Sequence, residues 1–218
     1  MQMGTHPTEN VQKTPQKRKR SSNREWKKLV AEFQKPHAGR ATWQLINTLV
    51  PLFAIWVSIY FLKDVSLWLC IPPAILGGLF MVRAFIIFHD CGHGSFLKSK
   101  RANSIIGFIT GTLTFTPYRQ WSWEHARHHA TNGDLDRRGI GDIWTLTVEE
   151  YVSSSRRLQL SYRFIRNPII LFVFAPIVLF VILQRFPNSK AKKKEKQSVY
   201  IMNATLAGWC IGMSMIYG

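Results

Sequence analysis

Two apolar segments decide the fold: WQLINTLVPLFAIWVSIYFL, from Trp43 to Leu62, and VSLWLCIPPAILGGLFMVRAFIIF, from Val65 to Phe88. The first contains 20 residues without a charge, the length that a helix needs to cross a hydrocarbon core of about 30 Å. The second contains one charge, Arg83, close enough to its end to reach the headgroups or to face the protein interior. Because only Lys63-Asp64 separates the segments, we expect an antiparallel transmembrane hairpin.

Shorter apolar segments follow the hairpin. Ser104–Phe115 would rise only about 18 Å as a helix, so we expect a re-entrant or interfacial piece. Thr147 and Glu150 have the spacing of a capping box, ahead of a helix whose mixed arginines and apolar residues are typical of the membrane surface. Pro168–Gln184 and Val199–Tyr217 are further spanning candidates near the lower length limit.

The composition favours a membrane protein over a nucleic-acid-binding protein. Apolar residues make up 46% of the chain and charged residues 19%, less than the usual quarter or so. The net charge is +17. We interpret this charge as an attraction to anionic lipid headgroups and as a signal for membrane topology. A solvated basic domain would not contain several apolar segments of membrane length. The three cysteines are far apart, which indicates neither a disulfide framework nor a zinc knuckle.

The distribution of charge divides the chain. Residues 1–40 are polar and basic, and we expect a disordered tail. Residues 41–218 are predicted to form one all-α integral membrane domain of helical hairpins and short interfacial helices. The first forty residues contain ten Lys and Arg and residues 89–166 contain eleven, which predicts that both lie on the cytoplasmic side. Residues 185–198 contain six more, yet simple counting of spans puts them on the far side. Either Pro168–Gln184 is not a full span or this loop breaks the rule.

Five of the seven histidines fall in two compact clusters. HDCGH (89–93) follows the second apolar segment with histidines at i and i+4, one turn apart on one helical face. WSWEHARHH (121–129) places three more at i, i+3 and i+4. One such pair is more often a surface accident, but two clusters beside a helix end favour a metal, and imidazole binds iron, copper, nickel and zinc. The predicted ligands are His89, His93, His125, His128 and His129.

The spacing argues against zinc. A zinc protease has a glutamate base in His-Glu-x-x-His, where the first cluster has Asp90 and the second has Ala126. Catalytic zinc is held by three protein ligands rather than five histidines. A set of five or more histidines fits two metals, and two irons can activate O2.

The two clusters also resemble a known family. HDCGH followed by GSF, and then HARHH, resemble the first two histidine boxes of the membrane fatty acid desaturases. Flanking stretches strengthen the resemblance: TN (131–132), GDIWTLT (141–147) and EEY (149–151). HDCGHGSF most resembles the Δ12/omega-6 acyl-lipid branch, bacterial members in particular, and the resemblance extends from about residue 40 to the end of the chain.

The resemblance implies a non-haem di-iron centre, held by eight or more histidines in three boxes, that introduces a double bond into a fatty acyl lipid using O2 and two electrons. The five histidines would be ligands, with no catalytic side chain beyond them. A ferredoxin- or cytochrome-type donor would dock on the basic cytoplasmic face of a bacterial inner (plasma) membrane. Asp134, Asp136 and Asp142, and Asp90 within the first box, are candidate acceptors that orient ligand imidazoles. Ion pairs with Arg127, Arg137 or Arg138 explain the first three equally well.

The chain departs from the family pattern at its end. No histidine follows His129, so the third box has no counterpart, and the chain stops inside an apolar segment. We therefore expect a truncated or partial product whose five ligands hold one iron, or two poorly. Two other functions stay open: a related fatty acid hydroxylase or carotenoid-modifying oxygenase, which shares histidine boxes, and an inactive membrane protein that binds one metal or none.

Overall fold

The computed structural model describes residues 30–31, 35–138 and 143–217. The chain divides into two units, Met1–Lys35 and Pro36–Gly218, and the second contains all the helices that bear on function. Most of the predicted disordered tail lies outside the described residues. Within the described ranges the secondary structure is helical and includes no strand, which confirms the all-α prediction.

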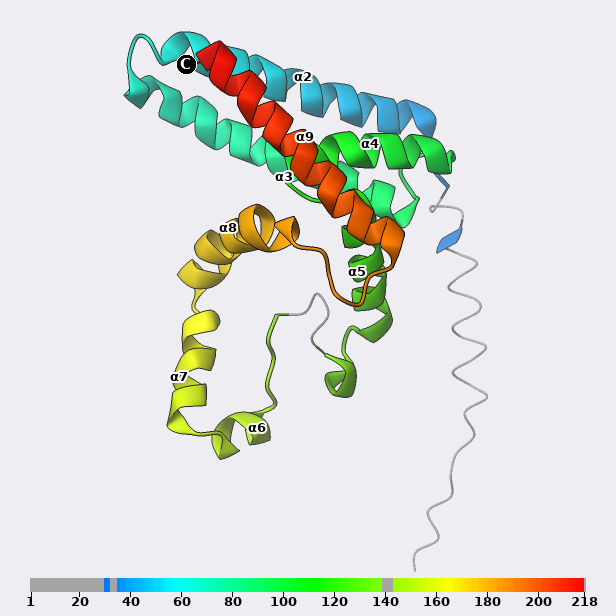
Figure 1. Ribbon diagram of the computed structural model, residues 1–218, viewed down its shortest axis with the longest axis vertical. Coiled ribbons are helices and arrows are strands. Elements are labelled where there is room, and N and C mark those ends of the chain that lie inside the picture. The colour runs from blue at the N-terminus through cyan, green and yellow to red at the C-terminus, as the bar shows by residue number, and fades with distance from the viewer. Residues whose placement is uncertain (1–29, 32–34, 139–142, 218) are drawn as a thin grey trace, which may run out of the picture. The chain divides into compact units, whose positions relative to one another are not determined.

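The predicted hairpin consists of α2 (Ala38–Leu62) and α3 (Ile71–His93), joined through a single 3-10 turn, η1 (Leu67–Cys70) (Figure 1). Both helices are long and apolar enough to cross a membrane when η1 is counted with α3. Arg83 of α3 turns towards α2, where its guanidinium donates to Asn47 Oδ1 at 2.6 Å. The one charge of the second segment therefore meets a polar partner on the neighbouring helix.

The first histidine box continues α3, so this helix extends five residues past Phe88, the end of the predicted apolar segment. Pro72 and Pro73 lie in its first turn, where the missing N–H groups cost no helical hydrogen bond. The helix ends at Gly94, whose φ of 70° is left-handed, a conformation that glycine adopts without strain. His89 and His93 therefore lie one turn apart on one continuous helix, as their spacing predicts.

Two shorter helices follow, α4 (Lys100–Leu113) and α5 (Tyr118–Thr131), each of 14 residues. The length of α4 confirms that this segment is too short to span. α4 lies close to its neighbours because of glycine: a Cβ at Gly111 would be 2.6 Å from the Thr116 carbonyl oxygen. A Cβ at Gly107 would be 2.2 Å from the ring of Tyr118, at the start of α5. The second histidine box lies on α5.

Residues 143–185, which we call the arm, begin with two short helices. α6 (Val148–Ser153) starts at the predicted capping box: Glu150 N–H donates to Thr147 Oγ1 (3.1 Å), and Thr147 N–H donates to the Glu150 carboxylate (2.7 Å). A separate helix, α7 (Arg156–Ile165), then combines arginines with exposed apolar residues such as Phe164. The predicted surface helix is thus two helices.

The predicted span at Pro168–Gln184 is helical in the structure, but it is irregular. This stretch consists of four short helical pieces: η3 (Ile170–Phe174), α8 (Ala175–Ile177), η4 (Val178–Ile182) and η5 (Leu183–Arg185). η3 and η4 are π-helical and flank the turn that contains Pro176, whose ring removes a backbone donor. The stretch reaches membrane length only together with α7, and the two are bent by 58°.

The last helix, α9 (Lys193–Tyr217), is the third that is long and apolar enough to cross a membrane. It runs back beside the hairpin, where Trp209 meets Trp56 edge to face at 6.0 Å (Figure 1). The loop before it packs on α5, since the Asn188 side chain donates to Glu124 Oε1 at 2.9 Å. The basic loop 185–198 therefore lies at the histidine end of the hairpin, which favours the first of the two alternatives: the stretch before it is not a full span.

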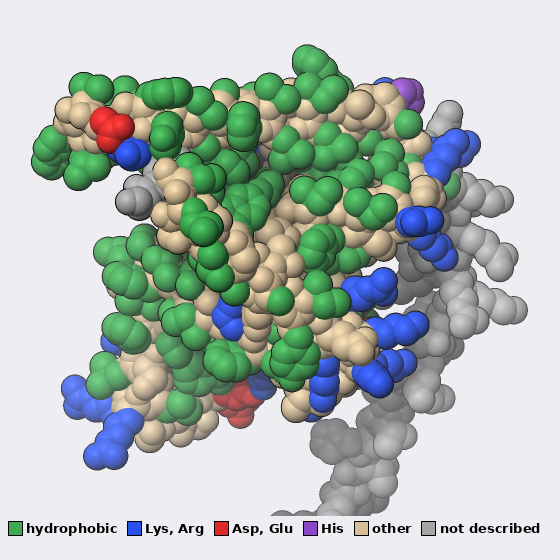
Figure 2. Space-filling view, turned by 45° about the horizontal axis from the view of Figure 1, so that its top comes forward, with side chains coloured by type: hydrophobic (Ala, Val, Ile, Leu, Met, Phe, Trp, Pro, Cys, Tyr) green, Lys and Arg blue, Asp and Glu red, His purple; other side chains and the backbone are tan. Residues whose placement is uncertain are grey.

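The surface matches this arrangement. Hydrophobic side chains cover much of the visible face of the long helices, while Lys and Arg gather towards one end of them and on the shorter helices (Figure 2). Large apolar residues such as Phe53, Leu79 and Ile211 are more than half exposed. In water such a surface would be costly, whereas in lipid it is the ordinary outer face of a helix. The chain is thus a membrane protein by its fold.

Candidate metal centre

Four of the five predicted ligands converge where the C-terminal end of α3 meets α5. His89 and His93 come from α3, and His125 and His129 from α5. The Nε2 atoms of His89, His93 and His125 form a triangle with sides of 3.0–3.2 Å, and His129 Nε2 lies 3.0 Å from His125 Nε2. All four candidate ligand atoms lie within 4.8 Å of one another. We call this set the four-histidine cluster.

The donor set fits a metal ion. At metal–nitrogen distances of about 2.0–2.1 Å, neighbouring imidazole nitrogens of one coordination sphere lie about 3 Å apart. The observed separations of 3.0–3.2 Å match that requirement. Four nitrogens gathered so tightly suit one ion, and a second would need ligands outside the cluster.

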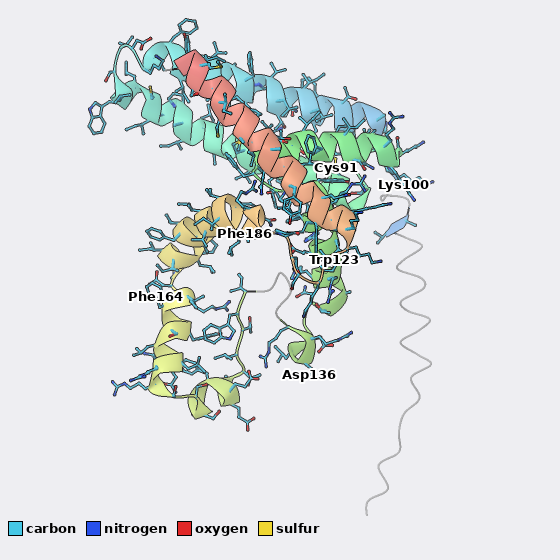
Figure 3. The ribbon with its side chains drawn as sticks, viewed as in Figure 1. Cys91, Lys100, Trp123, Asp136, Phe164 and Phe186 are labelled. Carbon is cyan, nitrogen blue, oxygen red and sulfur yellow. The ribbon has the colours of Figure 1, made fainter. Side chains whose placement is uncertain are left out.

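Aromatic packing holds the two helices in this register. The Trp121 ring lies 4.7 Å from Phe88 and stacks on His125 at 4.3 Å with an interplanar angle of 17°. The Tyr118 hydroxyl donates to the Cys91 carbonyl oxygen (2.7 Å), between the two histidines of α3. Figure 3 labels Cys91 and, on α5, Trp123. We call this contact region, residues 85–93 with 118–129, the junction.

The electrostatic environment keeps His125 uncharged. Burial, followed by the proximity of the other histidines, lowers the pKa of His125 to about 4. At neutral pH its imidazole is therefore neutral, which is the form that binds metals. Asp90 Oδ1 lies 3.1 Å from His89 Nδ1, so a proton on Nδ1 would direct Nε2 towards the cluster.

His128, the fifth predicted ligand, lies apart from the four. Its ring centre is 6.0 Å from that of His125 and 5.7 Å from that of His129. It lines a separate polar cavity of about 490 Å³, together with residues that include Asp134 and Arg138. Its role as a ligand stays a prediction.

The four carboxylates predicted to accept hydrogen bonds from ligand imidazoles also differ in their distance from the cluster. Asp134 forms an ion pair with Arg137 (2.6 Å), and this hydrogen bond holds the pKa of Asp134 below its ordinary value. Asp136 donates its backbone N–H to Asp134 Oδ1, and Asp142 lies outside the described residues. Of the candidates that the structure describes, Asp90 is the one beside a cluster histidine.

The sequence reasoning missed the residues that support the histidines. Trp121 is four residues before His125, one turn away on the same face, and this spacing was a signal that could have identified it. Glu124 was not foreseen, because its partner Asn188 is 64 residues away in the sequence. Burial raises the pKa of Glu124, and the hydrogen bond from Asn188 opposes that shift.

Two apolar cavities lie near the junction. One of about 420 Å³ is lined by residues of α2, α3, α4 and α9, and one of about 350 Å³ adjoins it, since Met81 and Phe115 line both. Phe85 lines the smaller cavity and meets Trp121 edge to face at 5.7 Å. Trp121 in turn stacks on His125, so apolar space extends to within two aromatic side chains of the cluster.

Four histidines that could hold a metal, at the end of a hairpin long and apolar enough to cross a membrane, are the features of a membrane metalloprotein, and comparisons with known proteins identify the family. The family model described as "Fatty acid desaturase" matches residues 66–218. A fatty acid desaturase of Bacillus subtilis (strain 168) is 45% identical over 191 residues, which are 88% of this chain and 54% of that protein. The chain belongs to the fatty acid desaturase family.

More distant relatives have more specific names. The sn-1 oleoyl-lipid 12-desaturase of Synechocystis sp. is 27% identical over 181 residues, 83% of this chain and 49% of that protein. The sn-1 acyl-lipid omega-3 desaturase (ferredoxin) of the same organism is 36% identical over 96 residues, 42% of this chain and 26% of that protein. The chain spans about half the length of the curated relatives or less. No solved structure matches it significantly.

Proposed function

We propose that this chain provides part of the iron site of an acyl-lipid desaturase, which introduces a double bond into a fatty acyl chain. The observation that supports this most directly is the convergence of four imidazole nitrogens at the end of a transmembrane hairpin. Family membership favours iron among the metals that imidazole binds. Iron, when bound, supplies the activation of O2 and the removal of hydrogen from an unactivated C–H bond.

The side chains have separate tasks in this proposal. The metal is held by His89, His93, His125 and His129. Asp90 fixes the tautomer of His89 by accepting a hydrogen bond from its Nδ1–H. Trp121 covers one face of His125 and limits the access of water from that side. His128 and further ligands outside the cluster would be needed for a second iron of a di-iron centre.

The substrate that best fits the surroundings is an acyl chain that stays in the bilayer. The two adjoining apolar cavities open among membrane-spanning helices and end beside Phe85, next to Trp121. An alkyl chain would fill such space without leaving polar groups unsatisfied. The names of the Synechocystis relatives, which specify acyl-lipid substrates, agree with this choice.

The electron donor is proposed to be a small acidic redox protein of the ferredoxin or cytochrome type. Its docking face would be the basic region at the histidine end, which includes the loop 185–198. By the positive-inside rule this face is cytoplasmic, and in a bacterium the membrane would be the plasma membrane. Electrostatic steering predicts that added salt slows reduction. A rate that does not depend on salt would contradict this docking face.

Two measurements test the proposal, one on the purified chain and one on cells that express it. Iron is quantified by inductively coupled plasma mass spectrometry after anaerobic loading with Fe²⁺, and membranes of expressing cells are analysed for new double bonds by mass spectrometry of fatty acid methyl esters. We expect about one iron per chain in the cluster and a new unsaturated product, with both lost in His125→Ala. His37→Ala is the matched control, because His37 caps α2 instead of joining the cluster.

Other outcomes identify other functions. Hydroxylated acyl chains would replace the desaturase proposal with the related hydroxylase, and modified carotenoids would indicate the carotenoid oxygenase. An iron content near zero would favour a membrane protein without metal chemistry. Iron without a product would leave the metal site intact and contradict desaturation by this chain alone.

A further inference from the structure

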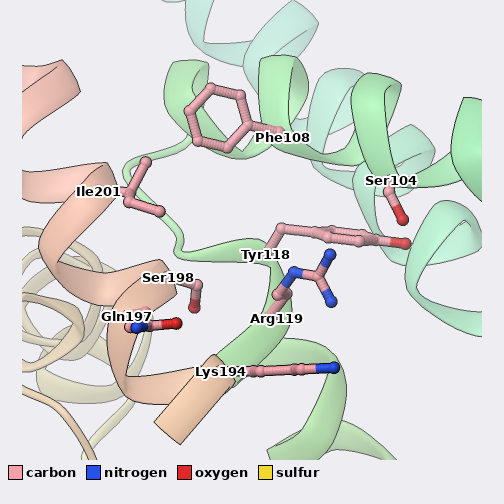
Figure 4. A pocket seen from close by; sticks show the side chains of 8 residues that line it. All are labelled: Ser104, Phe108, Tyr118, Arg119, Lys194, Gln197, Ser198 and Ile201. Atoms are coloured by element: carbon pink, nitrogen blue, oxygen red, sulfur yellow. The ribbon is translucent and has the colours of Figure 1, made fainter.

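Another cavity, also of about 420 Å³, lies on a different side of the junction, between α4, α5 and α9 (Figure 4). Phe108 and Ile201 lie at one end of it and Lys194 at the opposite end, with Arg119 between them (Figure 4). Ser104, Gln197 and Ser198 add hydroxyl and amide groups to its wall. Neither the metal site nor the apolar cavities use these side chains. Tyr118 also lines this cavity, and its hydroxyl donates to the Cys91 carbonyl oxygen in the junction.

The charge of this cavity has one sign. Two cations line it, and no carboxylate is among its described lining residues. It also lies beside the N-terminal ends of two helices, since Tyr118 begins α5 and Lys193 begins α9. Helix N-termini are partly positive and favour anions. The two ends are fixed to each other, because Gln120 N–H donates to Ser198 Oγ at 3.2 Å.

The position of the cavity along α9 is that of a lipid headgroup. Lys194 is in the first turn of α9, ahead of the apolar part of this spanning helix. Ile201 is seven residues further on, about 10 Å deeper along the helix axis at 1.5 Å per residue. The polarity therefore changes from cationic to apolar over the distance between the phosphate and the first carbons of the acyl chains in a phospholipid.

We propose that this cavity binds the phosphate of an anionic phospholipid. The phosphate oxygens would accept from the Arg119 guanidinium and the Lys194 ammonium. Gln197 and Ser104 would contact the glycerol and headgroup oxygens, and the start of an acyl chain would lie against Phe108 and Ile201. The inference does not depend on the proposed reaction, because none of these groups binds the metal.

The test is lipid binding to the purified full chain in detergent at physiological salt, measured by native mass spectrometry with phosphatidylglycerol and with phosphatidylcholine. Each cation beside a lipid phosphate contributes about fivefold to binding, so the double variant Arg119→Gln/Lys194→Gln should bind phosphatidylglycerol about thirtyfold more weakly. The matched control is Lys190→Gln/Lys192→Gln, which removes two exposed charges from the loop just before α9 and does not touch the cavity. Its affinity should change by about twofold or less, because salt screens distant exposed charges.

A second variant keeps the proposal testable if the double variant Arg119→Gln/Lys194→Gln does not fold. Gln197 is exposed on α9, and Gln197→Glu adds a negative charge to the cavity wall without removing bulk. It should weaken phosphatidylglycerol binding by about fivefold while the circular dichroism spectrum stays unchanged. Unchanged affinity in this variant would contradict the proposal.

Three other outcomes would also overturn the proposal. Equal losses in both double variants would show diffuse attraction to the basic loop and overturn the site. Equal binding of phosphatidylcholine and phosphatidylglycerol would overturn the preference for an anionic lipid. Displacement of phosphatidylglycerol by an excess of inorganic phosphate, at the affinity of the lipid itself, would assign the cavity to free phosphate instead.

Discussion

The junction and the arm use different interactions to fix their positions. At the junction, the buried ring of Phe88, the half-buried ring of Trp121 and a glycine contact between helices set the histidines against one another. In the arm, polar contacts predominate, such as the bidentate pair that Glu150 forms with Arg138, which precedes the arm, while large apolar side chains such as Phe172 remain exposed. Packed aromatic contacts hold a geometry more tightly than exposed ion pairs do. We therefore expect metal binding to depend on the junction and to tolerate changes in the arm.

The largest expected effect distinguishes two histidines of α5: His125, which belongs to the four-histidine cluster, and His128, which does not. His125→Ala removes the nitrogen that lies 3.0–3.1 Å from each of the other three, so Fe²⁺ binding should fall by more than about a hundredfold. His128→Ala removes an imidazole that is next to the cluster in sequence but apart from it in space, and should change the affinity of the cluster by less than about tenfold. Anaerobic Fe²⁺ titration measures both. Equal losses would mean that His128 belongs to the same site.

A smaller effect on the same property is expected from Asp90→Asn. The amide oxygen can still accept from His89 Nδ1, but the negative charge that raises the basicity of the imidazole is lost. We expect Fe²⁺ affinity to fall by about tenfold. Asp136→Asn is the control, because Asp136 is exposed and away from the four histidines. If both variants bind Fe²⁺ like the parent chain, Asp90 has no orienting role.

The two histidine boxes also show which parts of the site a local sequence pattern can predict. The spacing of His89 and His93 predicts one helical face, and α3 has it. On α5, the residues at i+3 and i+4 are equally good candidates by spacing, and the rotation of the helix against α3 decides between them. That rotation comes from the packing of Trp121 on Phe88, a tertiary contact that a local pattern does not contain.

The arm and the basic loop were harder to predict for related reasons. The hydropathy of Pro168–Gln184 indicates an apolar helix, but not the π-helical turns on either side of Pro176. The place of the loop 185–198 depends on Gln120, whose side-chain oxygen accepts from Asn188 N–H at 2.8 Å, 68 residues away. Contacts at such separations follow from the assembled fold, so counting apolar segments alone left the direction of the loop open.

The packing beside the junction is tested by adding a single methyl group at Gly111, on α4, which lies against Phe88. Gly111→Ala places a Cβ about 2.6 Å from a main-chain carbonyl oxygen, which no rotamer can relieve. Such overpacking costs about 1–3 kcal/mol, and we expect the free energy of unfolding to fall by that amount, together with weaker Fe²⁺ binding. Gly208→Ala on α9 meets nothing within 4 Å and should be nearly neutral. Unfolding by SDS titration in mixed micelles compares the two, and an equally stable Gly111→Ala chain would contradict the close contact.

The smallest effect should come from the arm, and it should stay local. Arg138, and then the Thr147 N–H, hold the pKa of Glu150 at about 2, below its ordinary 4.5. Because the folded pKa is depressed, the pair stabilises α6 fully above the ordinary pKa and loses this contribution as pH falls from about 4.5 to about 2. Hydrogen exchange in Val148–Ser153, corrected for its intrinsic pH dependence, should rise over that window.

Glu150→Gln should produce the same faster exchange already at pH 7 and remove its dependence on pH in that window. Glu149→Gln, an exposed neighbour on the same helix, should leave exchange close to that of the parent chain. Fe²⁺ affinity should be unchanged in both variants, because Glu150 lies in the arm and neither it nor Arg138 is among the four histidines' partners. A loss of Fe²⁺ binding in Glu150→Gln would mean that the arm helps to position the metal site, and that the junction does not hold its geometry alone.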